Sequence, residues 1–547
     1  MDLTTQERAP LRAVVTVRAD AASQVDPMIY GHFLESNFYG NIEGGVIDAA
    51  GPEGLGELRN SHLLRSDVIA CCRELKVPIV RWPGGNFTSA YHFQDGIGPP
   101  RERPRRLELA WGGEEANRFG TEEFLDWCEA VGTEPFLVNS ARNLEEALAW
   151  LEYTNYRGDT SWTRRRAQNG RSEARPVTYW GVGNEVYGDW QMGHRSAEAY
   201  AADAREHADF MRRIDPSLRL VGVGFPSKEW MAPFLRAAGD RFDYVSLHLY
   251  AASAHRYGAA GEDDYEQVVA QPLYFEREIG AFSELVCEEM AASTIERPIA
   301  IALDEWNIRH LEPSAWPEQA PHPDGGAKGF ADAPGERWPL RVNRWSSRTL
   351  ADALFYAGVF HVLHRAARRP VPVGMANTVN LINANGLIEV RGEQVIRSAS
   401  YYVWKLYQHH LGDEVLDVDV EGPGMLMRVR EGAAELEQNQ AGRAPAQFVP
   451  YLDVVATRRR GRDGFQVAVI NRHRDREIEL SLRGEGIGAD GEVRAHLHRI
   501  GGDVDDVLAV NTASRPDAVT IVEVGHVVAP GGNFRFPPHS ISVLEVA

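Results

Sequence analysis

The sequence contains no apolar run that approaches the roughly 20 residues a helix needs to span a bilayer. Its beginning, MDLTTQERAPLRAVV, also lacks the basic and then apolar order of a secretory signal. These two absences predict a cytoplasmic protein with no membrane partner.

Cysteine is scarce. None of the four cysteines belongs to a CxxC pair, and three of them lie in segments that favour helices. A disulfide framework needs a higher density of cysteine than this. We expect reduced thiols in the core at Cys71, Cys72, Cys128 and Cys287.

An excess of positive charge is also missing. The 58 lysines and arginines are outnumbered by 78 aspartates and glutamates, and the formal net charge of −20 would repel a phosphate backbone. Two basic runs, at 163–166 and 457–464, are short and set in polar sequence that favours loops. We interpret them as solvated arginines and predict no nucleic-acid partner.

Phosphate-binding motifs are incomplete. GVGNEV (181–186) and GVGFPS (222–227) begin like a GxGxxG turn, but Val186 and Ser227 stand where the third glycine belongs. No GxxxxGK occurs either. The sequence therefore argues against a nucleotide-binding enzyme.

Histidine is clustered at HLH (496–498) and HH (409–410), which could offer imidazole ligands to a metal. However, no HExxH motif of a metal hydrolase occurs, and the first cluster lies in sequence typical of a β-sandwich. We interpret both as surface histidines and predict neither a metal nor a cofactor.

From about residue 28 to 395 the chain alternates short β-branched or apolar runs with amphipathic helical stretches. This alternation indicates parallel strands joined by crossover helices. We expect eight strands, the number that closes a β/α barrel, although periodicity alone also allows an open doubly wound sheet. They lie at 28–34, 77–83, 134–139, 177–183, 218–224, 243–250, 298–306 and 374–382.

Helical stretches separate these strands. Thr121 and Asn143 are suitable N-caps, because acidic residues follow each in the first turn. The helices are expected at 66–76, 121–132, 143–153, 196–214 and 347–367.

After about residue 396 the pattern changes. One last helix at 398–412 gives way to alternating strands separated by Gly, Arg and Asp turns, which is typical of an antiparallel β-sandwich. The early segment 11–20 alternates in the same way, and we expect it to join that sandwich. The predicted fold class is α/β: a (β/α)8 TIM barrel with a C-terminal antiparallel β-sandwich. The predicted domains are an N-terminal sandwich strand, a catalytic barrel and a C-terminal sandwich, at 1–27, 28–395 and 396–547.

A barrel carries its working residues at the C-terminal ends of its strands, and six of the eight expected strands have polar residues there. Glu185 follows the fourth strand and Glu305 ends the seventh. Glycoside hydrolysis needs such a pair, one carboxyl group protonated and the other ionised. The alternative is a buried structural ion pair. The other polar residues at strand ends are Glu35, Arg81, Asn86, Asn184, His248, Tyr250 and Asn377.

Taken together, five motifs resemble the α-L-arabinofuranosidases of glycoside hydrolase family 51, across nearly the whole chain. They are IYGHFLE (29–35), VRWPGGNF (80–87), WGVGNE…WQ…GH (180–194), SLHLY (246–250) and LDEWN (303–307). The resemblance implies the barrel and sandwich expected above. It further implies a retaining, exo-acting hydrolase that releases terminal α-L-arabinofuranosyl residues from arabino-oligosaccharides, and a homo-oligomer, often a hexamer.

The resemblance also implies roles for individual residues. Glu185 falls at the position of the general acid/base and Glu305 at that of the nucleophile, with carboxyl groups about 5–5.5 Å apart in a retaining enzyme. Asn184 corresponds to the amide that binds the sugar 2-hydroxyl. The residues that bind other hydroxyls or orient the carboxylates correspond to Glu35, Arg81 and Asn86.

His248 and Tyr250 correspond to residues on the nucleophile side, where the Tyr250 hydroxyl would donate to Glu305. His248 is given a supporting role only. Asn377 is a departure, because the family commonly has glutamine there to hydrogen-bond the sugar's exocyclic hydroxyl or the nucleophile region. The glycone preference could therefore differ.

A long segment rich in Pro, Gly and Ala, at 310–338, follows the predicted nucleophile strand. Loops of this length are usually functional lids or disordered, and we expect Trp316 and Trp338 to border the aglycone site. Three alternatives stay open: a furanosidase that prefers galactofuranose, a β-1,4-glucanase of the same family, and a non-catalytic carbohydrate-binding protein.

Overall fold

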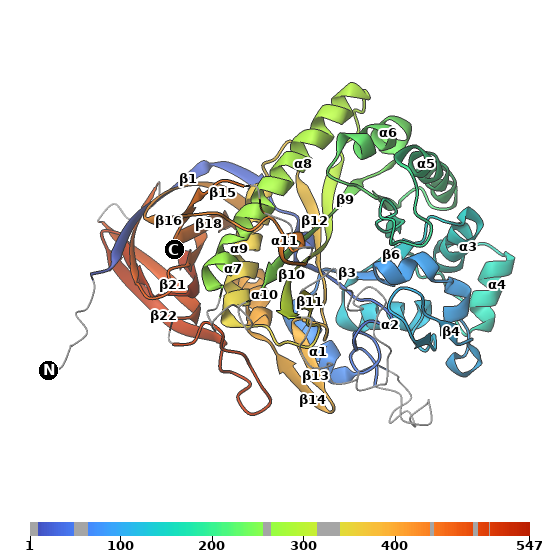
Figure 1. Cartoon of the computed structure of the whole chain (residues 1–547), viewed down its shortest axis with the longest axis horizontal. Helices are drawn as coiled ribbons and strands as arrows, with labels where there is room; N and C mark the ends of the chain where they lie inside the picture. The colour runs from blue at the N-terminus through green and yellow to red at the C-terminus, as the bar shows by residue number, and fades with distance from the viewer. Residues whose placement is uncertain are drawn as a thin grey trace.

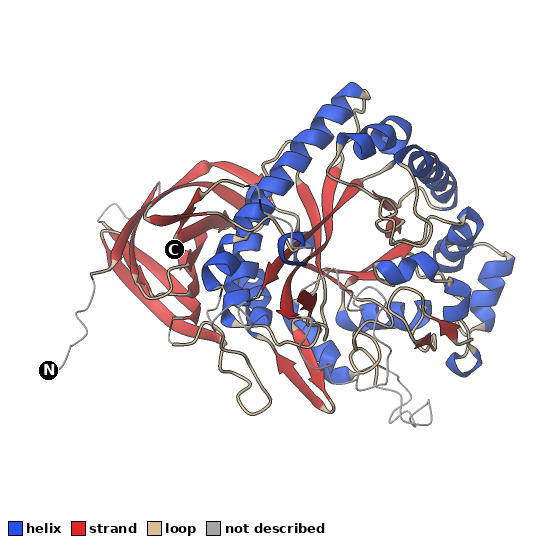
Figure 2. Ribbon diagram, viewed as in Figure 1, coloured by secondary structure: helices blue, strands red, loops and turns tan. Residues whose placement is uncertain are grey.

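The structure, a computed structural model, describes residues 9–48, 64–254, 264–313, 340–437, 442, 444–484, 491–502 and 504–546. A β/α part and a part made almost entirely of strands lie side by side (Figures 1 and 2). Within these ranges, no helix combines the length and the apolar character needed to cross a membrane.

Eight parallel strands close into a barrel in the β/α part. Neighbours pair in the order β10, β12, β2, β3, β6, β7, β8 and β9, and β9 pairs again with β10. This closure confirms the barrel and excludes the open sheet. Their bounds are β2 (Gly31–Phe33), β3 (Ile79–Trp82), β6 (Glu134–Asn139), β7 (Tyr179–Val182), β8 (Arg219–Gly222), β9 (Tyr244–Ser253), β10 (Ala300–Pro313) and β12 (Val373–Thr378). A short strand, β11 (Leu340–Val342), pairs antiparallel with the end of β10.

The lower interior of the barrel is an apolar layer. Alternate residues of a strand point to the same side, so the inward positions of several strands meet in one cluster. Its buried members are Ile79, Phe136, Val138, Val221, Ala302 and Met375. On β3 and β12 the residues two positions further along are polar, Arg81 and Asn377. The barrel therefore becomes polar only toward the C-terminal ends of its strands.

The helices expected from the sequence are present, and five others among the described residues were not among those predicted: α4, α6, α7, α8 and α11. Asn143 is the N-cap of α3 and accepts from the Glu146 amide at 3.2 Å. The prediction for Thr121 is wrong, because Gly120 is the N-cap of α2 and Thr121 is already helical. The bounds are α1 (Ser66–Leu75), α2 (Thr121–Val131), α3 (Leu144–Asn155), α4 (Ser161–Gln168), α5 (Ala197–Ile214), α6 (Lys228–Ala238), α7 (Tyr265–Ala270), α8 (Pro272–Ala292), α9 (Leu350–Ala366), α10 (Ala399–His410) and α11 (Ala434–Glu437).

Two expectations about individual side chains are corrected. The run 163–166 lies in α4 rather than in a loop, and Arg166 is buried, where it donates to the carbonyls of Tyr153 and Tyr156 at 2.7 and 3.0 Å. Main-chain carbonyls replace water around this guanidinium. Cys287 is exposed on α8, whereas the other three cysteines are buried, and all four are free thiols.

The second part contains one ladder of nine strands, in the order β22, β21, β24, β19, β18, β15, β1, β20 and β23. A single cluster of buried side chains draws residues from both halves of this ladder, so the sheet folds over a common core. The bounds are β1 (Leu11–Gln24), β15 (Glu414–Glu421), β18 (Leu452–Arg458), β19 (Phe465–Asn471), β20 (Ile478–Gly484), β21 (Glu492–Gly501), β22 (Ile521–Pro530), β23 (Asn533–Phe536) and β24 (Ser540–Val546).

The N-terminal strand β1 lies between β15 and β20, which confirms that the sandwich takes it up (Figure 1). It pairs antiparallel with β15 and parallel with β20. The second pairing is an exception to the antiparallel pattern expected. Three two-stranded ribbons complete the strands: β4 (Arg106–Leu107) with β5 (Glu114–Glu115), β13 (Ile388–Arg391) with β14 (Gln394–Arg397), and β16 (Gly424–Met427) with β17 (Gln447–Pro450).

Helix α9 lies between the barrel and the sandwich. Nearly all of its residues are buried, because it contacts α7, α8 and α10 as well as β18, β19 and β24. A buried ion-pair network also crosses this seam, where Asp453 of β18 accepts from Arg365 at 2.9 Å and from Arg472. The domain limits 1–27, 28–395 and 396–547 stay a prediction.

Candidate active site

The two glutamates predicted from the sequence meet at the C-terminal end of the barrel. Glu185 follows β7, and Glu305 lies in β10. One carboxylate oxygen of each and one ring nitrogen of His248 all lie within 4.8 Å of one another. The backbone of Glu185 has φ of 43°, in the left-handed region that non-glycine residues seldom adopt. The turn after β7 thus gives this side chain an unusual direction.

A β-bulge places two consecutive acidic side chains at the site. The register between β9 and β10 shifts between Ala302 and Glu305. In a regular strand Asp304 and Glu305 would point to opposite faces, and a bulge removes that alternation. As a result Asp304 accepts from Arg81 at 2.8 Å, while Glu305 also lies 3.2 Å from the Arg81 guanidinium.

Arg81 is the buried cation of the site. Its two terminal nitrogens contact Asp304, Glu305 and the Oδ1 of Asn184. Burial lowers the pKa of Arg81, but the charges of Asp304 and Glu305 outweigh burial and raise it. The guanidinium therefore stays charged and joins residues that follow β7 and lie in β10.

Glu305 is buried beside one hydroxyl donor and one fixed cation. The Tyr250 hydroxyl donates to its Oε2 at 2.6 Å, the contact expected from the sequence. Burial raises the pKa of Glu305, whereas the positive charges of His248 and Arg81 and the Tyr250 hydrogen bond oppose this rise. A Cβ atom at Gly85 would lie 2.7 Å from the Glu305 Oε1, so the PGG sequence after β3 is needed to leave room for this carboxylate.

Glu185 has a different set of donors. His248 Nδ1 lies 2.8 Å from its Oε1, and Trp190 Nε1 donates to its Oε2 at 3.1 Å. Burial would raise the pKa of Glu185, but the hydrogen bond and charge of His248 lower it to about 2. The longer contacts, at 3.4 Å, come from Tyr187 and Gln191.

His248 bridges the two sides of the site. Its Nδ1 faces Glu185, and its Nε2 lies 3.3 Å from Asp304 Oδ1. Burial lowers the pKa of His248, but the charge of Glu305 and the hydrogen bonds with Asp304 and Glu185 raise it to about 10. A protonated imidazole can donate through both of its ring nitrogens. The imidazole of His248 can therefore share protons with the carboxylates around it.

The remaining predicted residues lie around this cluster. Glu35 is buried and accepts through Oε1 from the amides of Gly85 and Phe87 at 3.1 and 3.0 Å. Burial raises the pKa of Glu35 to about 8, against the Phe87 hydrogen bond. Asn86 accepts from Gln191. The Nδ2 of Asn184 is buried and has no hydrogen-bond partner within the described part of the chain.

Asn377 is not joined to the carboxylate pair. It lies inside the barrel on β12 beside Gly31 of β2, and its Nδ2 donates to the His32 carbonyl at 2.9 Å. Its Oδ1 is buried without a hydrogen bond to any described residue. Trp316, Trp338 and nearly all of the 310–338 segment lie outside the described residues.

Sequence reasoning missed Asp304, Trp190 and Gln191. Asp304 stands beside Glu305 at the end of the seventh expected strand but was given no role, because the bulge that brings both side chains to the site cannot be read from the sequence. Trp190 and Gln191 were visible as part of the WQ motif, five and six residues after Glu185. The side-chain N–H groups of both residues contact Glu185. Gln191 also accepts a hydrogen bond from the Ser89 hydroxyl at 2.8 Å and donates one to Asn86.

Chemically, this arrangement offers two buried carboxyl groups in unlike surroundings. One is flanked by a fixed cation and a hydroxyl donor, and the other is hydrogen-bonded to a protonated imidazole. An unsatisfied amide N–H lies beside them. Such a site can supply a nucleophile and a proton to the same substrate.

Known proteins resemble the chain over nearly its whole length. Residues 71–267 match the family model "Alpha-L-arabinofuranosidase 1 domain", and residues 304–540 match "Alpha-L-arabinofuranosidase C-terminal domain". Alpha-L-arabinofuranosidase C of Emericella nidulans is 32% identical over 542 residues, which cover 96% of this chain and 95% of that protein.

Two further relatives are informative. The intracellular exo-alpha-(1->5)-L-arabinofuranosidase of Halalkalibacterium halodurans is 29% identical and covers 84% of each chain. The crystal structure of the alpha-L-arabinofuranosidase from Thermotoga maritima in complex with arabinose superposes with a TM-score of 0.79 at 30% identity, over 98% of this chain and 99% of that one.

Proposed function

Because the chain belongs to the α-L-arabinofuranosidases of glycoside hydrolase family 51, we propose that it releases terminal α-L-arabinofuranosyl residues from arabino-oligosaccharides with retention of anomeric configuration. Glu305 is the nucleophile and Glu185 the general acid/base. The observation that carries this proposal is the meeting of the two carboxyl groups at the end of the barrel, with one oxygen of each within 4.8 Å. Retaining glycosidases hold their carboxyl groups about 5–5.5 Å apart, while inverting ones need about 6.5–9.5 Å for an intervening water.

In the first step, a Glu305 oxygen attacks the anomeric carbon while the bond to the leaving oxygen breaks, and that oxygen takes a proton from Glu185. In the second step, Glu185 takes a proton from water, whose oxygen replaces Glu305 at the anomeric carbon. Arg81 and Tyr250 support the ionised form of Glu305.

The proton for the first step comes from His248. In the ligand-free arrangement His248 carries it and Glu185 is ionised, as their pKa values of about 10 and about 2 indicate. The donor Nδ1 of His248 and the acceptor Oε1 of Glu185 are 2.8 Å apart, so the proton can pass to Glu185 without a change in the charge of the cluster. As negative charge on Glu305 is consumed by attack, His248 loses a carboxylate that holds its proton, which favours this transfer.

Two neighbouring groups suit a sugar ligand. The free Nδ2 of Asn184 can donate to the 2-hydroxyl, a contact that strengthens in the oxocarbenium-like transition state. Burial raises the pKa of Glu35 to about 8. The carboxyl group is then protonated at neutral pH, and its O–H can donate a hydrogen bond to a sugar oxygen.

The test uses 4-nitrophenyl α-L-arabinofuranoside and arabino-oligosaccharides. Proton NMR of the first-formed product should show the α anomer, and inversion would refute the mechanism. Glu305→Ala should abolish turnover of every substrate. Glu185→Ala should spare the first step for good leaving groups and be partly rescued by azide. Equal losses on good and poor leaving groups would instead remove Glu185 from the acid/base role.

Cellular location and assembly are also proposed. A cytoplasmic enzyme that acts on imported oligosaccharides is supported by the name of the intracellular relative from Halalkalibacterium halodurans. A homo-oligomer, with a hexamer as the expected number, is supported by exposed apolar side chains on the edge strand β22, namely Val522, Val524 and Val528. Light scattering during gel filtration should give a mass above that of the 60.9 kDa chain.

A further inference from the structure

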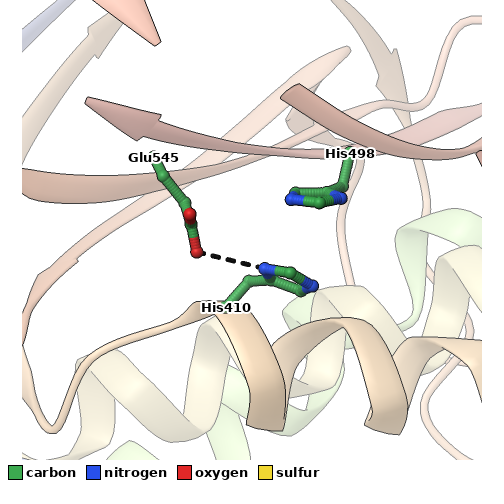
Figure 3. A group of neighbouring side chains, drawn as sticks. All are labelled: His410, His498 and Glu545. Atoms are coloured by element: carbon green, nitrogen blue, oxygen red, sulfur yellow. Dashed lines mark hydrogen bonds and ion pairs between the residues drawn. The ribbon is translucent and has the colours of Figure 1, made fainter. Parts of the chain in front are cut away.

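A second group of histidine and carboxylate side chains lies far from the barrel mouth, where α10 packs on the sandwich. His410 is the last residue of α10, His498 lies in β21 and Glu545 in β24. One donor atom of each lies within 4.8 Å of the others. Figure 3 shows the ring of His498 above the ring of His410, with the Glu545 carboxylate directed at His410 from the side.

Strand pairing explains why two of these residues share a face. β21 and β24 are antiparallel, with His496 opposite Glu545 and His498 opposite Val543. Since side chains alternate along a strand, His496, His498 and Glu545 all point to the same side. Val543 on this face belongs to the core shared with α9 and α10. The face is therefore turned toward the helix that carries His410.

The contacts within the group are close. His410 Nδ1 lies 3.0 Å from Glu545 Oε1, and the rings of His410 and His498 have centroids 3.8 Å apart. His498 is 8% exposed, and its ring makes ring contacts but no hydrogen bond with any described residue. The prediction of surface histidines is thus wrong for His498, because helix packing covers it. Within the described part of the chain, the ring nitrogens of His498 are therefore available to a ligand.

We propose that this seam binds a divalent transition-metal ion, with His410, His498 and Glu545 as its three protein ligands and water in the fourth position. Two imidazoles and one carboxylate form a donor set that zinc uses in proteins with an open fourth position. Imidazole favours Zn²⁺, Ni²⁺ or Cu²⁺ over Mg²⁺ and Ca²⁺, which prefer oxygen. The earlier expectation that the protein has no metal rested on the absence of a local motif, whereas these ligands come from three separate elements.

The geometry requires only side-chain adjustment. Ligand atoms around tetrahedral zinc lie about 3.3 Å apart for bonds of about 2.0–2.1 Å, and the donor atoms here lie within 4.8 Å. The rings of His410 and His498 lie over one another at an interplanar angle of 34°, so at least one imidazole must turn for both to direct a nitrogen at one ion. The side chains of His410 and Glu545 are 24% and 32% exposed, which leaves room for this turn and an entry path.

Further polar side chains border the three proposed ligands. Around the site, His496 lies beside His498 with ring centroids 4.7 Å apart and is paired with Glu523 at 2.9 Å. This pair can hydrogen-bond to a metal-bound water.

A metal at this position would join the helix that packs on α1 and α9 to the sandwich. It would act on the stability of the seam and not on the reaction, because the ligands come from elements outside the site at the barrel mouth. Anything that binds the folded state alone raises its thermal midpoint. The signature of the site is thus stabilisation by one ion per chain without a change in kcat.

The experiment uses the full chain without a polyhistidine tag, stripped with a chelator and titrated with Zn²⁺ by calorimetry at pH 7.5. The Glu305→Gln variant is titrated in parallel, because it removes a donor from the carboxylate cluster at the barrel mouth. We expect one Zn²⁺ per chain in both proteins, a higher thermal midpoint with Zn²⁺ but not with Mg²⁺, and weaker binding at pH 5.5 as the imidazoles gain protons.

Substitutions locate the ion. His498→Gln and Glu545→Gln should each weaken Zn²⁺ binding by about tenfold or more, since even the loss of an outer-shell partner costs about 10–100-fold. The matched control is His526→Gln, an exposed histidine opposite His496 on β22 but outside the ligand set, which should leave the affinity unchanged. If His498→Gln does not fold, His410→Gln at the more exposed position replaces it. Absence of stoichiometric binding to the folded chain, or binding that survives the ligand substitutions, would overturn the proposal.

Discussion

Replacing Tyr250 by phenylalanine removes one hydroxyl group from the site and leaves the aromatic ring, over which the Arg309 guanidinium lies 3.8 Å from the centroid. The hydroxyl donates to Glu305 Oε2 at 2.6 Å. A buried hydrogen bond to a charged acceptor contributes about 1.5–3 kcal/mol. Because the bond favours the ionised form of Glu305, its loss raises the pKa of Glu305 above the already raised value.

The consequence is visible in the pH dependence of kcat/KM, whose acid limb reports ionisation of the nucleophile in the free enzyme. The limb should move to higher pH in Tyr250→Phe. On the acid side, a loss of about 1.5–3 kcal/mol lowers kcat/KM by about 10- to 150-fold. At pH values above the acid limb of both the wild type and Tyr250→Phe, the loss of kcat/KM should be smaller. Glu305 is then ionised in both proteins, and the substitution destabilises the free ionised nucleophile as well as the transition state.

The assay is a stopped measurement of 4-nitrophenol release at closely spaced pH values, with the fold checked by circular dichroism at each. The matched control is Tyr187→Phe, whose hydroxyl donates to the other glutamate, Glu185, and only at 3.4 Å. It should leave the acid limb in place. An unmoved limb in Tyr250→Phe, or an equal movement in the control, would show that the 2.6 Å contact does not set the ionisation of Glu305.

Three further predictions concern other contacts. Glu35 has a pKa raised to about 8, so the stability it contributes is present below its ordinary pKa of about 4.5 and is lost as pH rises toward 8. In Glu35→Gln, the free energy of unfolding measured in urea should fall less over this pH range, by up to about 5 kcal/mol. An unchanged dependence of the unfolding free energy on pH would contradict this. Trp190→Phe removes an N–H donor from Glu185, so the basic limb of kcat/KM should move to higher pH, while a downward movement would refute the contact's role. Asp453→Asn leaves Arg472 buried beside a neutral partner. The free energy of unfolding in urea titrations should fall by roughly 3–5 kcal/mol, while kcat at 25 °C stays unchanged. A loss below about 1 kcal/mol would contradict the role of this ion pair.

The sequence was informative where a property is local. Strand and helix periodicity depends on neighbouring residues, so β6 was predicted with its observed bounds and the other barrel strands within a few residues at most ends. The side chains that meet at the barrel mouth were found for a similar reason, because a polar residue that ends an apolar strand is conspicuous. Glu185, Glu305 and Tyr250 were all selected in this way.

Local sequence patterns do not reveal where a backbone departs from regular alternation. Asp304 directly precedes Glu305, and in a regular strand the two side chains would point to opposite faces. The bulge in β10 arises from how that strand pairs with β9 and β12, which is a property of the assembled barrel. Similarly, Arg166 and Cys287 were misjudged because solvent exposure depends on which elements pack over a segment.

By itself, then, the sequence determined the order of the elements, the eight barrel strands followed by a sandwich, and the pair of glutamates, because each is written in short-range patterns of polar and apolar residues. Only the tertiary structure decided that the eight strands close, how the glutamates contact His248 and Arg81, and that His410, His498 and Glu545 come together. Residues so distant along the chain become neighbours through packing of a helix on a sheet, and no local pattern encodes that contact.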